Sequence, residues 1–355
     1  MRSVLSGTGN GVGAGVGLTG LDMVNASDGW AESKDAVFRT SDGGRSWSRV
    51  LQAGGTSTNN IVVAFNGRQD AWAAITSAEA ESVLYRTTDG GSTWARSSLA
   101  MLSTGSAATF LDFTSDQQGW LWVSIPGGGM GDAPGMLYGT TDGGREWTRE
   151  AMSSAGSPGG AIPGEPKTGM AFSGSKDGWM SGAYPSAGGD GFVVRTTDGG
   201  RTWTAERSPF SVSSSYALTA VYPFVFSGGA VEMFGVYMGG SSTTEGGSAG
   251  ELVASRDAGA TWSAGQMLAV PGPSRFLVWS FPQADYGIAT NGSEVYVTED
   301  GGTSWANFAP RQSLHGVVAL DFISTLSGFA LVSGVSQRDT ILETTDGGHT
   351  WTAIG

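Results

Sequence analysis

Cysteine is absent from the 355-residue chain, which excludes disulfide bonds, thiol nucleophiles and cysteine-ligated zinc. This absence leaves the redox compartment open, because a protein without cysteine is compatible with either state. Histidine occurs only as His315 and His349, which argues against a multi-histidine metal centre or a histidine proton relay. The sequence therefore predicts no metal site and no cofactor.

Positive charge is also scarce, since 19 basic residues stand against 32 acidic ones and give a formal net charge of −13. Binding to nucleic acid depends on clustered Lys and Arg, so no nucleic-acid partner is expected. With only three lysines, a polybasic membrane anchor is excluded. No apolar run reaches the roughly 18–20 residues of a membrane helix. The N-terminal "MRSVLSGTGNGVGAGVGLTG" lacks the apolar core and cleavage site of a signal peptide.

Glycine, in contrast, is abundant, with 59 residues that follow no collagen-like period. Hydrophobic residues at 39% and aromatic residues at 10% are ample for a packed core. The apolar residues fall in runs of about four to six β-forming residues bounded by Gly, Asp, Asn or Ser, with no sustained helical period. The pattern predicts an all-β protein in which helix is almost absent.

One short stretch, "LYRTTDGGSTW", is repeated seven times with small changes. Its aspartates are Asp42, Asp89, Asp142, Asp198, Asp257, Asp300 and Asp346. Its tryptophans are Trp47, Trp94, Trp147, Trp203, Trp262, Trp305 and Trp351. A fixed motif in seven copies indicates a repeat architecture before it indicates an active site.

A second signature precedes each copy: an apolar run, a polar turn, then an aromatic residue, as in "LDFTSDQQGWLWV". The later units are degenerate, and Tyr286 and Phe329 are expected to replace the tryptophan. Each unit is interpreted as four strands, which in the first unit lie near residues 20–24, 29–33, 36–40 and 47–51. The copies are 43 to 59 residues apart, close to the roughly 40–50 residues of a propeller blade.

The chain is thus predicted to form one seven-bladed β-propeller of four antiparallel strands per blade, after a flexible or ring-closing segment at residues 1–15. The simplest ring closure joins blades one and seven without a shared strand; alternatively "RSVLS" adds a strand to the last blade. The expected blades span about 16–53, 54–100, 101–152, 153–208, 209–267, 268–310 and 311–355.

The repeated stretch resembles the Asp box, or BNR repeat, whose pattern is [Ser/Thr]-x-Asp-x-Gly-x-[Ser/Thr]-Trp. "TTDGGSTW" and "TTDGGRTW" match at every position, whereas "TTDGGREW" places Glu146 in the second Ser/Thr position. From about residue 16 to 354 the fuller unit is similar to the bacterial and plastid photosystem II stability and assembly factor family. That resemblance implies a propeller that binds a protein client.

Physical reasoning assigns the repeated aspartate to structure rather than to catalysis. A carboxylate at the turn between the third and fourth strands can accept several backbone N–H bonds, and the glycines permit positive φ. The tryptophan buries a large surface against its own blade. Seven equivalent copies suit a structural device, because an active site needs only one.

Contact residues are sought on both faces of the ring. Loops longer than their siblings join the second and third strands or successive blades, and they carry Met130, Met136, Tyr184, Tyr237 and Met238. On the opposite face, arginines cluster near the motif in the first four units. The candidate binding residues there are Arg39, Arg45, Arg86, Arg145, Arg195 and Arg201, with Arg49, Arg96 and Arg149 nearby. The alternative for the arginines is ordinary surface charge stacked on neighbouring indoles.

Catalytic interpretations find less support. Asp boxes occur in sialidases, but the Arg-Ile-Pro motif of those enzymes is missing here, and xyloglucan-cleaving hydrolases pair two propellers. Asp22, Asp112 and Asp321 recur at "LDM", "LDF" and "LDF" on innermost strands, where they either form a glycosidase pair or bond to a neighbouring turn. No catalytic residue is assigned.

The preferred hypothesis is a monomeric, non-catalytic propeller outside the cytoplasm that binds a protein partner as an assembly or stability factor. The alternative is a carbohydrate-binding or glycoside-hydrolysing propeller.

Overall fold

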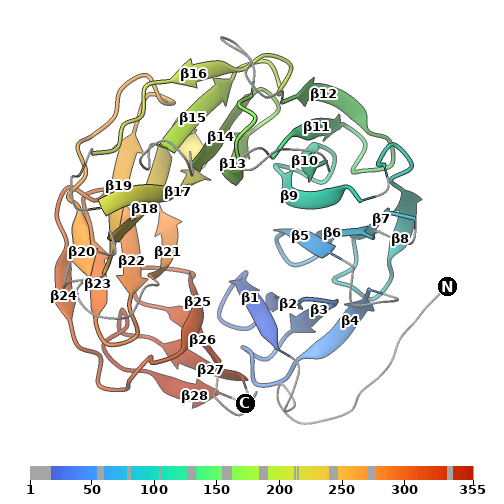
Figure 1. The fold of residues 1–355 in the computed structure, drawn as a ribbon. Coiled ribbons are helices and arrows are strands. Elements are labelled where there is room, and N and C mark those ends of the chain that lie inside the picture. The colour runs from blue at the N-terminus through green and yellow to red at the C-terminus, as the bar shows by residue number, and fades with distance from the viewer. Residues whose placement is uncertain are drawn as a thin grey trace.

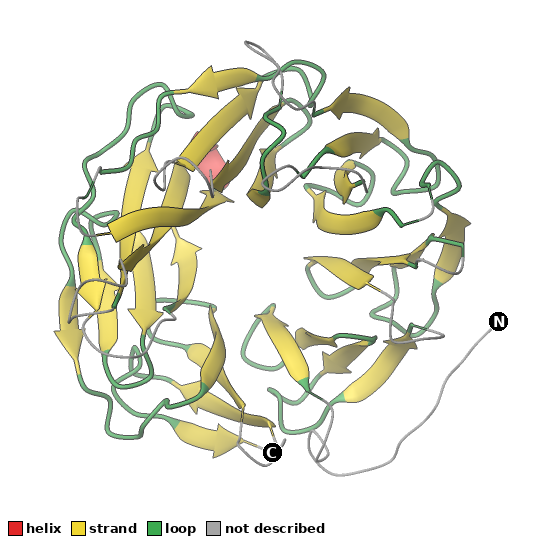
Figure 2. Ribbon diagram, in the orientation of Figure 1, coloured by secondary structure: helices red, strands yellow, loops and turns green. Residues whose placement is uncertain are grey.

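The computed structural model describes residues 17–53, 60–77, 81–103, 105–125, 133–153, 162–183, 191–211, 213, 216–239, 247–270, 277–333 and 339–354. These residues form seven four-stranded antiparallel sheets arranged as a ring (Figure 1). The seven-bladed all-β fold expected from the repeats is confirmed. Figure 2 shows the predominance of strand, and the one helical element among the described residues is the short 3₁₀ helix η1 (Ser227–Gly229).

The strands follow chain order within each blade. Blade one contains β1 (Leu18–Met23), β2 (Gly29–Ser33), β3 (Ala36–Thr40) and β4 (Ser48–Gln52). Blade two contains β5 (Asn60–Asn66), β6 (Asp70–Thr76), β7 (Val83–Thr87) and β8 (Ala95–Ser98). Blade three contains β9 (Ala107–Phe113), β10 (Gly119–Ser124), β11 (Gly135–Thr140) and β12 (Thr148–Met152). Blade four contains β13 (Lys167–Ser173), β14 (Asp177–Ala183), β15 (Gly191–Thr196) and β16 (Thr204–Glu206).

The remaining three blades have the same order. Blade five contains β17 (Tyr216–Val225), β18 (Val231–Gly239), β19 (Ser248–Ser255) and β20 (Leu268–Val270). Blade six contains β21 (Val278–Gln283), β22 (Tyr286–Thr290), β23 (Val295–Thr298) and β24 (Ala306–Phe308). Blade seven contains β25 (Val317–Phe322), β26 (Gly328–Ser333), β27 (Asp339–Thr344) and β28 (Thr352–Ile354). The first strand of every blade lies nearest the ring axis (Figure 1).

The turns between the first and second strands and between the third and fourth strands share one face of the ring. Backbone hydrogen bonds join them directly, as in Gly43 N–H to Ser27 C=O at 2.7 Å and Gly199 N–H to Lys176 C=O at 2.9 Å. We call this the repeat-turn face, and we call the seven turns between third and fourth strands the repeat turns. The face assignment made from the strand order is therefore correct for these turns.

The register shows which residue of each second strand is equivalent to Trp30. Trp30 lies opposite Arg39, and the corresponding residues in the later blades are Trp72, Trp120, Trp179, Glu232, Ile288 and Phe329. Ile288, not Tyr286, therefore occupies the aromatic position of blade six. Tyr286 was expected at this position because it is the aromatic residue nearest to it in the sequence. In the sheet, however, Gly287 pairs as Gly29 does, so the residue after Gly287 is the equivalent of Trp30.

Apolar side chains pack mainly between neighbouring blades. Trp30 stacks on Phe65 with ring centroids 5.2 Å apart, and Trp120 stacks on Phe172 at 3.8 Å. In each pair the first ring belongs to one blade and the second to the innermost strand of the next. The fold is therefore held together by side chains that cross each junction, as expected where one sheet face must cover another.

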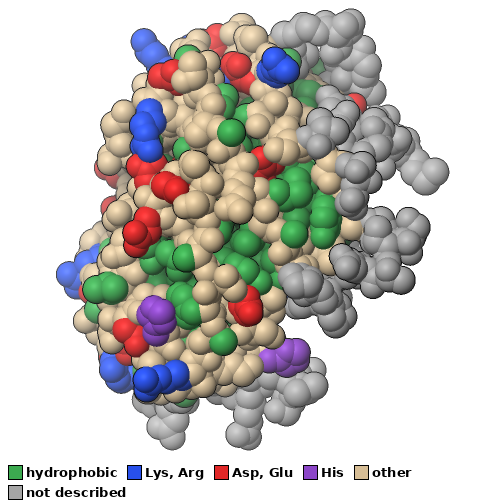
Figure 3. Space-filling view, turned by 90° about the vertical axis from the view of Figure 1, so that its left-hand side faces the viewer, with side chains coloured by type: hydrophobic (Ala, Val, Ile, Leu, Met, Phe, Trp, Pro, Cys, Tyr) green, Lys and Arg blue, Asp and Glu red, His purple; other side chains and the backbone are tan. Residues whose placement is uncertain are grey.

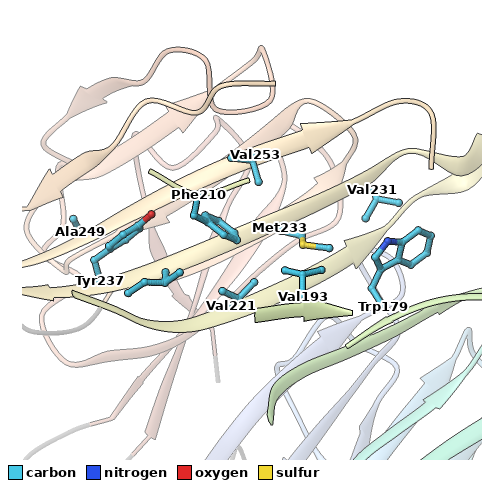
Figure 4. Close-up of a cluster of buried hydrophobic side chains, with 10 residues drawn as sticks. Trp179, Val193, Phe210, Val221, Val231, Met233, Tyr237, Ala249 and Val253 are labelled. Carbon is cyan, nitrogen blue, oxygen red and sulfur yellow. The ribbon is translucent and has the colours of Figure 1, made fainter. Parts of the chain in front are cut away.

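Tyr237 belongs to one such junction and is not a surface contact residue as the sequence suggested. It is 1% exposed and lies beside Phe210 and Ala249 between blades four and five (Figure 4). Its hydroxyl hydrogen-bonds to the Glu251 carboxylate. The sequence suggested that Tyr237 lies in a long loop, but β18 extends to Gly239 and therefore includes Tyr237.

Blades one and seven meet through hydrogen bonds from backbone to carboxylate. The Leu18 N–H donates to Asp339 at 2.8 Å, and the Met23 N–H donates to Asp321. Among the described residues each sheet draws its four strands from one continuous stretch, so neither blade borrows a strand. The alternative in which "RSVLS" supplies a strand falls outside the described residues.

Blade five offers a test of the repeat-turn geometry, because Ala258 stands where the other six turns have glycine. Its φ is +56°, while the equivalent glycines lie between +68° and +78°. A Cβ in this left-handed region is strained, so Ala258→Gly is expected to raise the free energy of unfolding by about 0.5–1 kcal/mol.

Chemical denaturation measures the change. Ala260→Gly, two residues along the same turn and without positive φ, is the matched control and should lower stability instead. Equal losses from both substitutions would contradict the expected strain.

Candidate functional site

Each repeat turn is closed by the same hydrogen bonds, which explains the spacing of the motif. In blade four the Thr196 hydroxyl donates to Asp198 at 2.8 Å and accepts the Gly200 N–H at 2.9 Å. The other Asp198 oxygen accepts the Thr202 hydroxyl at 2.7 Å. Asp42, Asp89, Asp257, Asp300 and Asp346 accept the same hydroxyl bonds on their two oxygens. Asp142 accepts the bonds of its own turn through Oδ1, because Glu146 replaces the second hydroxyl residue.

These bonds stabilise the ionised carboxylate and lower the pKa of all seven repeat aspartates, to about 2 for Asp257. A permanently ionised carboxylate that accepts several hydrogen bonds within its own turn is poorly suited to proton transfer. The motif tryptophans add to the closure where their indole N–H reaches the turn, as in Trp203 to Gly200 C=O at 2.8 Å and Trp351 to Gly348 C=O at 2.9 Å. The repeat turns thus have the bonding of structural locks.

Three of the candidate binding arginines lie against the indole ring of a tryptophan in their own blade. The Arg39 guanidinium is 4.9 Å from the Trp30 ring centroid, and its side chain is 13% exposed. Arg86 over Trp72 and Arg195 over Trp179 are each at 5.6 Å. These arginines therefore act largely within the fold, and the expectation of an open arginine surface on this arc is wrong for them.

An aspartate at the start of the second strand anchors this arrangement. Asp28 pairs with Arg39 at 3.0 Å, and Asp177 pairs with Arg195 at 3.1 Å. Blades five to seven lack both the tryptophan and the opposite arginine. The arginine is thus present in blades one, two and four, where it faces the indole, and is absent from blades five to seven, which have no indole at this position.

The other three candidate arginines follow the glycines of their turns and are exposed. Arg45 and Arg201 have side chains that are 61% and 69% exposed. Arg201 pairs with Glu150 of the preceding blade at 3.2 Å, and Arg45 approaches Glu343 of blade seven at 3.9 Å. Arg145 donates to the Asp142 carbonyl of its own turn at 2.9 Å. These groups remain available at the surface.

Blade three departs from its siblings and opens a cleft. It keeps Trp120, but Gln118 and Gly139 stand where blades one and four have the aspartate and the arginine. A cavity of about 750 Å³ lies at this place, between the repeat turns of blades three and four. Its lining includes Gln118, Trp120, Gly139, Thr148, Glu150 and Arg201. Sequence reasoning missed this cleft, although the change from "FRTSD" to "YGTTD" was its signal.

Carboxyl groups on the inner strands form a second feature. Asp112 accepts the Phe172 N–H of the next blade at 2.7 Å, and Asp321 accepts the Met23 N–H. Burial raises their pKa values to about 6 and about 7. Two of the three inner aspartates therefore tie neighbouring strands together, which was one of the two roles expected for them.

At the junction of blades one and seven, Asp22 interacts with the carboxyl groups of both Glu32 and Asp321. Burial, with added repulsion from Asp22, raises the pKa of Glu32 to about 7. Asp22 is in contact with solvent, yet the surrounding inner strands desolvate it enough to raise its pKa to about 6. Perturbed carboxyls of this kind are typical of functional sites as well as of structural networks.

The remaining candidate residues are dispersed. Met136 is half-buried, Met238 is 36% exposed, and Met130 and Tyr184 lie outside the described residues. The two histidine side chains lie apart in Figure 3, and His349 stacks on Phe308 at 3.9 Å. On the side of blades five and six shown there, lysine and arginine are scattered among acidic groups. The described residues contain no cluster of three metal-ligating side chains and no helix long and apolar enough to cross a membrane.

No protein-family model and no curated protein sequence matches the chain. Among solved structures it is similar to one described as "YCF48 bound to D1 peptide", with a TM-score of 0.54, 16% identity, and coverage of 97% of this chain and 94% of that one. A polysaccharide lyase, "PL25-Ulvanlyase bound to -[GlcA(1-4)Rha3S]-", gives a TM-score of 0.57 at 9% identity, with 98% and 97% coverage. A GH74 enzyme from Niastella koreensis gives 0.40 at 15% identity, and the chain spans 62% of its length. At these identities the similarity shows the fold, which peptide-binding and polysaccharide-cleaving proteins share.

Proposed function

We propose that this protein is a non-catalytic propeller that binds a polypeptide segment of a partner protein, as an assembly or stability factor would. The observation that carries the proposal is the cleft between blades three and four. Its lining mixes carboxylates, cations, hydroxyls and backbone groups, which suits the polar backbone and side chains of a peptide. The similar propeller described as bound to a peptide is consistent with this use of the fold.

A carbohydrate ligand fits the cleft less well. Sugar rings bind to exposed aromatic platforms, whereas Trp120 is 1% exposed and is covered on one face by Phe172. The seven repeat aspartates are occupied by their own turns, so they offer no carboxylate pair for glycoside hydrolysis. The proposal also includes a monomeric state and an extracytoplasmic setting.

Site-specific photo-cross-linking tests the proposal. A photoreactive residue replaces exposed Thr148 in the cleft, with Ser48 of blade one as the matched control, because the two positions pair with Gly139 and Arg39 respectively. We expect a defined protein to be captured from extracts of the native host at Thr148 and not at Ser48. A glycan array run alongside that enriches a defined glycan, with no protein captured at either position, would contradict the proposal.

A second candidate function rests on Asp22, Glu32 and Asp321, whose raised pKa values permit protonation near neutral pH. A protonated carboxyl beside an ionised one is the chemistry of glycoside hydrolysis. The test is release of reducing ends from a polysaccharide panel, compared with Glu32→Gln. Activity that is abolished by this substitution would favour the enzymatic candidate over the binding protein.

A further inference from the structure

Three asparagines of the sequence are followed by glycine, and the structure describes two of them, Asn66 and Asn291. The third, Asn10, lies outside the described residues. An asparagine before glycine is prone to deamidation, because the backbone nitrogen of the next residue can attack the side-chain amide carbon and glycine has no Cβ to hinder the approach. In a folded protein the reaction depends on how firmly the amide and the attacking nitrogen are held.

In blade six both groups are held. The Asn291 side-chain oxygen accepts the N–H groups of Ser293 at 2.9 Å and Glu294 at 2.8 Å. The attacking nitrogen is also occupied, because the Gly292 N–H donates to the Thr290 hydroxyl at 3.0 Å. Gly292 is buried, so this turn cannot change its conformation without breaking these bonds inside the fold.

In blade two the same two groups are free. Asn66 ends β5 and Gly67 begins the turn to β6, and both residues are exposed. Among the described residues the Asn66 side chain forms no hydrogen bond and the Gly67 N–H has no acceptor. A Cβ built on Gly67 would meet no atom within 4 Å, and the φ of Gly67 is +70°. The side-chain amide and the attacking nitrogen can therefore rotate toward each other without losing a contact.

We propose that Asn66 is a site of spontaneous deamidation in the folded protein, whereas Asn291 is protected by its turn. The Gly67 nitrogen bonds to Cγ of Asn66, the bond from Cγ to the amide nitrogen breaks, and that nitrogen leaves as ammonia with the proton of the Gly67 N–H. Water, the only co-reactant, then opens the cyclic imide. Cleavage at the side-chain carbonyl gives aspartate, and cleavage at the backbone carbonyl gives isoaspartate, whose main chain is longer by one methylene.

The modification acts on the junction of blades one and two. The Gly67 carbonyl accepts the Trp30 indole N–H at 3.0 Å, and the next residue, Arg68, pairs with Asp28 of blade one at 3.1 Å. Isoaspartate lengthens the backbone immediately before Gly67 and so displaces both of these partners of blade one. Aspartate adds a negative charge to the exposed turn but leaves the backbone path unchanged. The two products therefore differ in their effect on this junction.

The experiment incubates the full chain at mildly alkaline pH and follows both asparagines with time by peptide mapping and mass spectrometry. We expect Asn66 to convert at least about tenfold faster than Asn291, because the hydrogen bonds of the Asn291 turn must break first. In the denatured chain the two rates should be similar, because each asparagine is then followed by an equally free glycine. No conversion at Asn66, or the same ratio of rates in the folded and the denatured chain, would overturn the proposal.

Variants separate the chemistry from its consequence. Asn66→Gln keeps an amide but disfavours the five-membered ring, so it should abolish conversion at residue 66 and leave the rate at Asn291 unchanged. Asn66→Asp carries the charge of one product and should unfold at the same temperature as the native protein. The isoaspartate form, separated by ion exchange from the incubated protein, should unfold at a lower temperature. An isoaspartate form as stable as the native protein would overturn the assigned effect on the junction.

Discussion

Replacing Trp72 by alanine is expected to lower the free energy of unfolding by about 3–5 kcal/mol, among the largest effects of any single substitution in this chain. Trp72 is fully buried and stacks on Phe113 of the next blade with centroids 3.9 Å apart. Its indole N–H donates to the Gly143 carbonyl at 3.1 Å, so the substitution also removes a bond across the junction. Denaturant unfolding monitored by circular dichroism measures the loss.

The same residue tests whether Arg86 is structural. If the guanidinium stabilises the fold through the Trp72 ring, Arg86→Ala should lower stability by about 1–2 kcal/mol in the native background. In the Trp72→Ala background it should lower stability less, with a coupling energy of about 0.5–2 kcal/mol. Trp72→Phe, which keeps most of the stacking but loses the N–H bond, should fall between the native protein and the alanine variant. Strict additivity of Trp72→Ala and Arg86→Ala would mean that the arginine acts independently of the ring.

The second large effect is an unusual pH dependence of stability. Burial raises the pKa of Glu32 and Asp321 to about 7 and of Asp112 to about 6, well above their values in the unfolded chain. Between pH about 4 and pH about 7 the folded protein retains protons that the unfolded chain has released, so stability falls as the pH rises. This loss is complete about one pH unit above the folded pKa values, near pH 8.

The repeat aspartates act in the opposite direction. Their pKa values lie below the ordinary value, so their contribution is present above pH about 4 and is lost as the pH falls further. The two sets together predict a stability maximum near pH 4–5 rather than at neutral pH. Thermal unfolding from pH 3 to pH 8 should locate it.

Single substitutions identify which carboxyl groups cause the fall in stability between pH 4 and pH 7. Glu32→Gln removes a titrating group and should make the decline between pH 4 and pH 7 shallower, as should Asp321→Asn. Asp116→Asn removes an exposed carboxylate of the repeat-turn face and serves as the charge-matched control. A profile that rises steadily to pH 7 in the native protein would mean that the inner carboxyls do not set its shape.

The fold was accessible from the sequence because the repeat encodes its own geometry. The hydroxyl, aspartate, glycine and tryptophan of each repeat turn are local partners, and their spacing is fixed by hydrogen bonds within a few residues. Tertiary partners were harder to recognise. The position of Ile288 depends on pairing with β23, and the burial of Tyr237 depends on Phe210, neither of which a local pattern specifies.

The candidate site illustrates the same limit. The arginines were visible in the sequence, but only the register shows that Arg39 and Arg195 face Trp30 and Trp179. Their role changes once the indole partner is known. The cleft at Gly139 arises from a missing side chain, and an absence acquires meaning only when the equivalent positions are aligned in space.

The carboxylate that ties one inner strand to the next has a wider consequence. Asp112 joins blade three to blade four, and Asp321 joins blade seven to blade one by the same bond to the same backbone position. The junction between last and first blade is therefore chemically equivalent to one inside the chain, although no peptide bond crosses it. A circularly permuted protein that begins at another blade would contain the same set of junctions, because these hydrogen bonds do not depend on the order of the blades in the chain.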